Sequence, residues 1–222
     1  MYFVLFIRIA LWSWAVSALV DHRFKKYAKV YLPLTGREVA EKMLRDNGIY
    51  DVQVTCTPGH LTDHYDPRNK TVNLSEAVYS SNNVAAAAVA AHECGHAVQH
   101  AFSYAPLNMR SALVPVVNFA SQWVTWILLG GILMVETFPQ LLLVGIILYA
   151  LTTLFAFITL PVEINASRRA IAWLEQSGIT DYQTTPMASS ALRSAAYTYV
   201  VAALSSLGTL IYYILIFTSR RD

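Results

Sequence analysis

Long apolar segments separated by polar blocks dominate the pattern along this chain. Four segments approach the roughly 20 apolar residues that a helix needs to cross the hydrocarbon core of a bilayer. They comprise about residues 2–20, 113–135, 139–160 and 195–218. The middle two contain no charged side chain, and residues 136–140 connect them, so we expect a helical hairpin. The pattern predicts an integral membrane protein that is mainly α-helical, with about four transmembrane helices.

The first and last apolar segments are less pure than the middle pair. Arg8 interrupts the first, and the last carries Tyr, Ser and Thr side chains that we expect to face protein rather than lipid. Residues 15–17, Ala-Val-Ser, would suit the cleavage site of a signal peptide. The positive charges follow this segment instead of preceding it, at Arg23, Lys25, Lys26 and Lys29. This order favours a membrane anchor whose C-terminal side stays in the cytoplasm.

The polar block 21–112 contains signals for a helix and a small β-sheet. Thr35 and Glu38 form a capping box, which predicts a helix that ends at Asn47-Gly48. Its apolar face comprises Val39, Ala40, Met43 and Leu44. Residues 51–56 alternate like a strand, and after a loop at 60–69 residues 71–74 form a second short strand. That second strand has two interpretations: the edge of a small sheet, or a strand that pairs with an extended substrate.

The strongest chemical signal lies in the Ala-rich run from Val84 to His100, where Ser81-Asn82-Asn83 offers N-cap oxygens. Residues 92–96 read His-Glu-Cys-Gly-His. Two histidines four residues apart share one helical face, so both imidazoles can reach one zinc ion. The intervening Glu93 is then placed to take a proton from an activated water. His100 lies about 12 Å from His92 along the helix, too far to bind the same ion.

A catalytic zinc site of this kind needs a third protein ligand. No histidine follows His100, which leaves acidic side chains, and the credible ones are Glu136, Glu163, Glu175 and Asp181. Glu136 lies at the tip of the hydrophobic hairpin, one bilayer thickness away, whereas at Glu163 the chain has crossed back. Glu163 is therefore the expected ligand. The alternative is that Glu163 is an interfacial carboxylate paired with Arg168 or Arg169.

Charge and cysteine content narrow the remaining possibilities. A formal net charge of +2 and no basic face argue against nucleic-acid binding. Cys56 and Cys94 are too few for a disulfide framework and lie outside any CxxC pattern, so they are expected to be free thiols.

Four blocks in this order resemble the bacterial membrane zinc metallopeptidases of the YugP type. The blocks are residues 61–68 (LTDHYDPR), 90–100 (AAHECGHAVQH), 159–170 (TLPVEINASRRA) and 195–201 (AAYTYVV). The YugP type is itself distantly similar to the HtpX-like and CAAX-prenyl membrane proteases. The resemblance implies one Zn²⁺ per chain held by His92, His96 and Glu163, with Glu93 as the general base.

The sequence departs from the more distant relatives at one position. Their pattern places an Asp four residues after the ligand Glu, and this chain has Ser167 there. A hydroxyl can still hydrogen-bond an imidazole or a carboxylate, but it adds no negative charge. Further candidates for supporting the ligands or the oxyanion are His64, Arg168, Arg193, Tyr197 and Tyr199. For most of these a structural role is the simpler interpretation, and for His64 that means a loop hydrogen bond with Asp63 or Asp66.

These signals predict a single integrated unit over residues 1–222, with a zincin-like HExxH helix and a small β-sheet. Its polar catalytic parts are residues 21–112 and 161–194. The expected activity is zinc-dependent hydrolysis of peptide bonds in a peptide or membrane-protein substrate. The rival hypotheses are a catalytically inactive zinc-binding scaffold or quality-control adaptor, and a transporter or channel, for which only Arg8 is a fitting intramembrane charge.

The positive charges also predict the topology. Nine of the sixteen Lys and Arg residues lie between Asp21 and Lys70, so we expect the site to face the cytoplasm from a bacterial cytoplasmic membrane, with both termini outside. Arg220 and Arg221 depart from this rule, because they follow the last segment.

Overall fold

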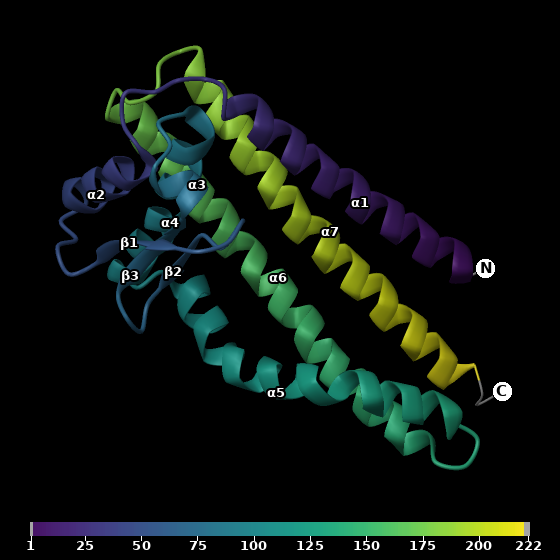
Figure 1. Ribbon diagram of the computed structural model, residues 1–222. Coiled ribbons are helices and arrows are strands. Elements are labelled where there is room, and N and C mark those ends of the chain that lie inside the picture. The colour runs from purple at the N-terminus through teal and green to yellow at the C-terminus, as the bar shows by residue number, and fades with distance from the viewer. Residues whose placement is uncertain (1, 220–222) are drawn as a thin grey trace. The chain divides into compact units, whose positions relative to one another are not determined.

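The computed structural model describes residues 2–219, so Arg220 and Arg221 lie outside the described residues. The chain divides into two compact units. The site unit comprises Ala15–Leu107 and Pro161–Thr198, and the apolar unit comprises Met1–Trp14, Asn108–Leu160 and Tyr199–Asp222. The long helices α1 (Tyr2–Tyr27), α6 (Pro139–Gln176) and α7 (Thr184–Thr218) each contribute to both units (Figure 1).

Helix α2 (Gly36–Asp46) forms in the site unit as its capping box predicts. The Thr35 side chain accepts from the Glu38 amide while the Glu38 carboxylate accepts from the Thr35 amide. The predicted apolar face, Val39, Ala40, Met43 and Leu44, is buried. Asn47 is the C-cap and Gly48 has a φ of 71°, a left-handed conformation in which glycine carries no penalty.

The sheet has three strands, one more than predicted. β1 (Gln53–Thr57) pairs in parallel with β3 (Thr71–Ser75), and β2 (His64–Asp66) pairs with β3 in an antiparallel arrangement. The prediction of a loop over residues 60–69 is therefore wrong at His64–Asp66, which form β2. β3 is the central strand in the order β1-β3-β2, so both interpretations of residues 71–74, a sheet edge and a substrate-pairing strand, are also wrong. Both edges of β3 are already occupied by strands of this chain.

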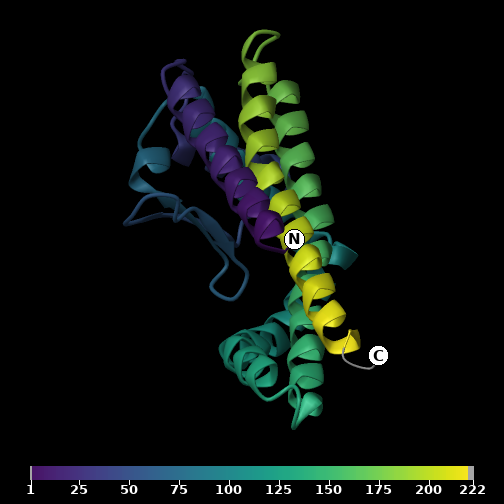
Figure 2. The ribbon, with the colours of Figure 1, turned by 90° about the vertical axis from the view of Figure 1, so that its right-hand side faces the viewer.

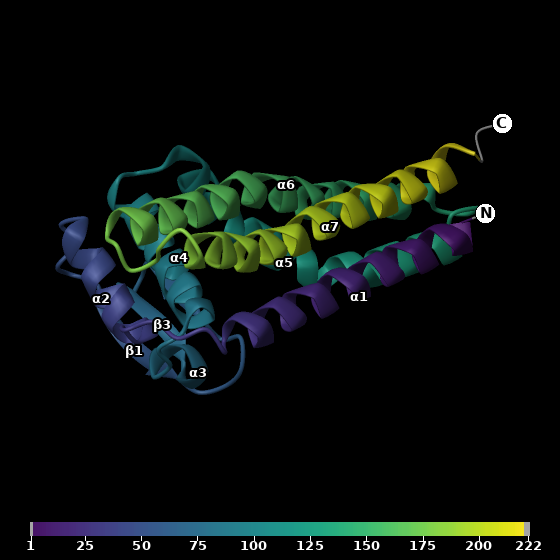
Figure 3. The same cartoon turned by 90° about the horizontal axis from the view of Figure 1, so that it is seen from above.

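Helix α4 (Val84–Ala101) lies at the centre of the site unit. The Asn83 side chain accepts from the Ala86 amide at 2.9 Å, which confirms the predicted N-cap. The short helix α3 (Glu76–Tyr79), which the sequence did not predict, packs on α4, as does the sheet (Figure 3). Most of α4 is buried, because its run of alanines allows neighbouring elements to approach closely on several faces.

The apolar unit contains the predicted helical hairpin. Helix α5 (Ala105–Leu133) and α6 are joined by a short turn at residues 134–138 (Figure 2). The two helices approach closely at Gly131, where an added Cβ would lie 2.6 Å from the Leu142 Cα. α5, α6 and α7 are long and apolar enough to cross a membrane. α1 is helical over the first predicted segment but is not among these candidate spans, so its crossing stays a prediction.

Candidate metal centre

Helix α4 presents His92 and His96 on one face, one helical turn apart. Their ring centroids are 4.8 Å apart and nearly perpendicular, with an interplanar angle of 84°. Glu93 lies between them in sequence and is 9% exposed. The spacing therefore brings the two imidazoles together as the motif predicts.

The two residues between Glu93 and His96 pack α4 against its neighbours. An added Cβ at Gly95 would lie 2.7 Å from the carbonyl oxygen of Ala166 on α6, so glycine permits this close helix crossing. The Cys94 thiol is buried and lies 3.5 Å from the Ala40 carbonyl oxygen of α2. Burial raises the pKa of this thiol well above its ordinary value. Cys56, by contrast, is exposed, and both cysteines are free thiols as predicted.

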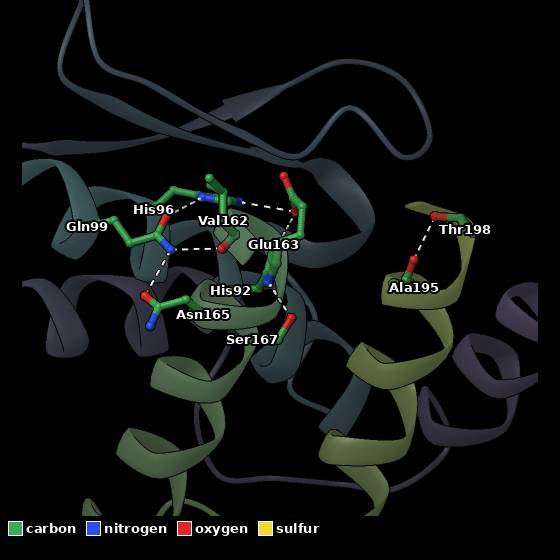
Figure 4. A network of polar contacts seen from close by, with 9 residues as sticks. All are labelled: His92, His96, Gln99, Val162, Glu163, Asn165, Ser167, Ala195 and Thr198. Atoms are coloured by element: carbon green, nitrogen blue, oxygen red, sulfur yellow. Dashed lines mark hydrogen bonds and ion pairs between the residues drawn. The ribbon is translucent and has the colours of Figure 1, made fainter. Parts of the chain in front are cut away.

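Helix α6 brings Glu163 to the two histidines. The Glu163 Oε2 atom lies 3.3 Å from His92 Nε2 and 3.5 Å from His96 Nε2. Figure 4 shows the two rings and this carboxylate directed toward one another. Glu163 is 3% exposed, and the close crossing at Gly95 sets how near α6 approaches α4.

The donor set fits a zinc ion in chemistry and spacing. Bonds of about 2.0–2.1 Å to nitrogen and oxygen place tetrahedral donor atoms about 3.3 Å apart. The two carboxylate-to-imidazole distances match this value, and the donor atoms of all three residues lie within 4.8 Å of one another. Two neutral imidazoles and one carboxylate are a common ligand set of catalytic zinc. Among the described residues, His92, His96 and Glu163 are the group of His, Cys, Asp or Glu side chains that could hold a metal ion.

The electrostatics of the site follow from its burial and its two acidic groups. Burial lowers the pKa of the His96 imidazole, but Glu163, through a hydrogen bond and its charge, and Glu93, through its charge, raise it by more. The pKa of His96 therefore lies above its ordinary value. A site that attracts a proton in this way also attracts a metal cation, because both bind the same nitrogen.

Each histidine has a polar partner at its second ring nitrogen. Ser167 Oγ lies 3.1 Å from His92 Nδ1. The serine that stands where the more distant relatives have an Asp therefore contacts an imidazole. His96 Nδ1 lies 3.1 Å from the Oε1 atom of Gln99. Gln99 and its neighbour Asn165 were not among the predicted residues. The available signal was a glutamine one turn after the second histidine, in an otherwise apolar and buried helix.

The other acidic candidates do not join this group. Glu175 is exposed on α6. Asp181 caps the start of α7, where its Oδ1 accepts from the amides of Gln183 and Thr184. Arg168 is exposed, and Arg169 donates to the Asn165 side chain at 2.8 Å. The predicted alternative of an ion pair between Glu163 and one of these arginines is not formed among the described residues.

His64 forms its hydrogen bonds outside the metal centre. His64 Nδ1 lies 2.7 Å from the Thr62 carbonyl oxygen, and His64 Nε2 lies 3.2 Å from Asn73 Nδ2. The expected hydrogen bond of His64 with Asp63 or Asp66 is wrong, because Asp63 accepts from Ser75, and Asp66 accepts from Arg68 and Asn69.

Four further side chains were candidates in the sequence. Arg193 and Tyr197 are exposed on α7. Tyr199 belongs to the apolar unit, and its role stays a prediction. His100 lies 2.9 Å from the Tyr65 hydroxyl, which links the end of α4 to β2 in a structural role.

The fold and the group formed by His92, His96 and Glu163 are those of a membrane zinc metallopeptidase, and the comparison with known families agrees. The family described as "Putative neutral zinc metallopeptidase" matches residues 2–218, and this chain belongs to that family. The chain is similar to the "Putative membrane protease YugP" of Bacillus subtilis (strain 168), with 44% identity over 205 residues. That match covers 91% of this chain and 90% of the relative. No solved structure matches the chain significantly.

Proposed function

We propose that this protein is a zinc-dependent membrane endopeptidase that uses Glu93 as its general base. The observation that carries the proposal is the position of Glu163, whose Oε2 atom lies 3.3 and 3.5 Å from the two histidine nitrogens of the HExxH helix. A structural carboxylate needs only one partner, whereas this one approaches both imidazoles at the spacing of tetrahedral zinc ligands.

In this proposal His92, His96 and Glu163 hold one zinc ion per chain. When bound, zinc supplies a positive charge that acidifies a water molecule and polarises a peptide carbonyl. Glu93 follows a ligand directly on α4 and is not a member of the three-residue group, so its carboxylate remains available for proton transfer. It accepts a proton from the attacking water and then donates that proton to the leaving amine.

The second candidate is a zinc-binding membrane scaffold without activity. Such a protein needs the three ligands but no base. The presence of Glu93 between the ligand histidines, in a site that is nearly closed to solvent, favours the enzyme. The relative's printed name, a membrane protease, supports the same choice.

We further propose that the site faces the cytoplasm and acts on peptides or membrane proteins. The support is the distribution of Lys and Arg, nine of which lie between Asp21 and Lys70. The long apolar helices α5, α6 and α7 place the protein at the bilayer, where membrane-protein substrates are accessible.

The test compares the wild-type protein, purified in detergent, with Glu93→Gln. Casein and a membrane-protein reporter serve as substrates, and each reaction is run as purified, with a chelator, and after zinc is added back. We expect the wild type to cleave, the chelator to abolish cleavage and zinc to restore it. Glu93→Gln should retain one zinc per chain and lose at least about a hundredfold in turnover, the usual scale of a lost general base.

The matched control is Glu175→Gln, an exposed carboxylate on α6 outside the metal centre, which should behave like the wild type. A wild-type protein that carries a full zinc ion and cleaves neither substrate would favour the scaffold. Equal activity of Glu93→Gln and the wild type would remove Glu93 from the mechanism.

A further inference from the structure

Gln99 is fully buried one helical turn after His96, and each polar atom of its side-chain amide has a partner. Its Oε1 atom lies 3.1 Å from His96 Nδ1. Its Nε2 atom donates to the Val162 carbonyl oxygen at 2.8 Å and to Asn165 Oδ1 at 3.0 Å. Figure 4 shows Gln99 between the ligand histidine on α4 and these two residues on α6.

Two fixed groups determine the direction of every hydrogen bond that connects Arg169, Asn165, Gln99 and His96: the Nε–H of Arg169 and the backbone carbonyl of Val162. An arginine Nε–H can only donate, so Asn165 presents an oxygen to Arg169, at 2.8 Å. A backbone carbonyl can only accept, so Gln99 must direct its NH₂ group toward Val162 and Asn165. The Gln99 oxygen is then left facing His96, and the hydrogen bond between them requires the proton to be on Nδ1.

This assignment has a direct consequence for the metal centre. A neutral imidazole with its proton on Nδ1 has its lone pair on Nε2, the atom that lies 3.5 Å from the Glu163 carboxylate. The same amide joins α4 to α6 immediately beside Glu163, because Val162 precedes the third ligand in sequence. One buried side chain therefore orients a ligand on one helix and holds the helix that supplies another.

We propose that Gln99 is a positioning residue of the zinc centre, which fixes the tautomer of His96 through an amide oriented by Val162, Asn165 and Arg169. The proposal rests on the proposed function, since it takes His96 as a zinc ligand. It differs from an ordinary packing role, because the required property of Gln99 is an oxygen acceptor at the position of Oε1. Partners at the second ring nitrogen of a zinc-bound histidine typically contribute about 10- to 100-fold in metal affinity.

The experiment measures zinc affinity by competition with a chromophoric chelator, together with thermal unfolding of the chelator-treated full chain in detergent. Gln99→Met keeps the length of the side chain and removes the acceptor, so we expect zinc affinity to fall about 10- to 100-fold. Gln99→Glu keeps an acceptor for His96 Nδ1 while losing the two donors to α6. Its zinc affinity should lie well above that of Gln99→Met, even if its unfolding temperature falls. Gln176→Met, an exposed glutamine at the end of α6, is the control and should match the wild type.

A second pair keeps the proposal testable if Gln99→Met does not fold. Asn165→Asp retains an oxygen for both Gln99 and Arg169, so its zinc affinity should stay close to that of the wild type. Asn165→Leu removes one of the two acceptors that orient the Gln99 amide and leaves the Val162 carbonyl, so its zinc affinity should fall by less than that of Gln99→Met.

In zinc-free protein labelled with ¹⁵N-histidine, at a pH where His96 is neutral, the ring resonances of His96 should report a proton on Nδ1 in the wild type and a mixture of tautomers in Gln99→Met or Asn165→Leu. Wild-type zinc affinity in Gln99→Met, or in Asn165→Leu, would overturn the inference. Equal losses in Gln99→Met and Gln99→Glu would also overturn it, since they would indicate packing alone. These outcomes differ from failure of the proposed function, in which the wild-type protein itself would bind no zinc or would bind it without cleaving any substrate.

Discussion

At the residue scale, the positions between His92 and His96 have packing requirements of their own. Glu93 is followed by Cys94, whose thiol is buried against α2, and by Gly95, which meets the backbone of α6 at Ala166. A pattern that specifies only two histidines and a glutamate leaves these two positions open. In this chain the space between α4 and its neighbours restricts both of them to small side chains.

Gly95→Ala tests the close crossing of the two ligand helices. The added Cβ would lie 2.7 Å from the Ala166 carbonyl oxygen, a backbone atom, so α4 and α6 must separate. We expect a loss of about 1–3 kcal/mol in the free energy of unfolding, as for other overpacked interiors. Zinc affinity should fall as well, because Glu163 moves with α6. Chemical unfolding and zinc competition measure the two effects.

The control for this substitution is Gly208→Ala, where the nearest atom to the added Cβ is a side-chain atom of Ile9 at 3.8 Å. That variant should retain both stability and zinc affinity. A Gly95→Ala protein with unchanged zinc affinity would show that the helix crossing does not set the ligand geometry.

At the scale of elements, α6 is the helix that completes the site. It continues beyond the predicted span to Gln176 and places Glu163 against α4 and Trp173 against α2. The Trp173 Nε1–H donates to Asp46 Oδ2 at 3.1 Å, and the same oxygen accepts from Lys42 at 2.9 Å. Because α6 is held both beside α4 and, through Trp173, against α2, the Glu163 carboxylate stays in place relative to the two histidines.

The two carboxylates on the later part of α6 should behave differently on removal. Glu163→Ala loses a ligand from a three-ligand site, so bound zinc and activity should both fall markedly. Glu175→Ala and Glu136→Ala should leave bound zinc unchanged. Metal analysis of the purified variants decides the question. Full zinc in Glu163→Ala together with its loss in Glu175→Ala would place the third ligand later on the helix.

The Asp46 contact with α6 predicts a dependence of stability on pH. Its hydrogen bond with Lys42, followed by the one with Trp173, lowers the pKa of the Asp46 carboxyl in the folded protein. A carboxyl with a lowered pKa in the folded protein adds to the free energy of unfolding at pH values above its unfolded pKa of about 3.9. This contribution is lost as the pH falls through the lower pKa of the folded protein.

Thermal unfolding measured from pH 7 down to acid should therefore show a smaller decline in Asp46→Asn than in the wild type. Asp21→Asn, at an exposed position on α1, is the matched control and should follow the wild type. An Asp46→Asn protein that loses stability on acidification as steeply as the wild type would exclude this contribution.

At the scale of the whole molecule, the chain combines long apolar helices with a unit that carries the metal centre. α5, α6 and α7 are long and apolar enough to span a bilayer, and the site unit contains all three members of the ligand group. The members of this group on α4 and α6 are separated in sequence by the hydrophobic hairpin. The metal centre therefore depends on segments from both sides of that hairpin.

The orientation of the site unit can be tested with its own exposed thiol. If the site faces the cytoplasm, a membrane-impermeant maleimide should leave Cys56 unlabelled in intact cells and label it after permeabilisation. Cys94 should stay unlabelled in both cases, because it is buried and its pKa is raised. Ser219→Cys in a Cys56→Ser background should be labelled in intact cells, since Ser219 follows the end of α7. Labelling of Cys56 in intact cells would reverse the proposed topology.

Local signals in the sequence were sufficient for several elements and for the two histidines of the group that could hold a metal ion. The capping box at Thr35, the N-cap at Asn83 and the HExxH spacing act over three or four neighbouring residues, so they can be recognised without the fold. The length of the apolar segments likewise identified the helices α5, α6 and α7, because the thickness of a bilayer sets how many apolar residues a spanning helix needs. Glu163 was predicted from those lengths, because a completed crossing was expected to return the chain to the histidines, and the structure places its carboxylate beside both of them.

The tertiary structure alone decided what depends on contacts between distant residues. Residues 71–74 became a central strand because β2, too short to show an alternating pattern, pairs with their second edge. Gln99 became a partner of His96 only because α6 supplies a carbonyl and an amide that orient it. Period and propensity describe a segment and its nearest neighbours, whereas strand order and the direction of a buried hydrogen bond belong to pairs of segments.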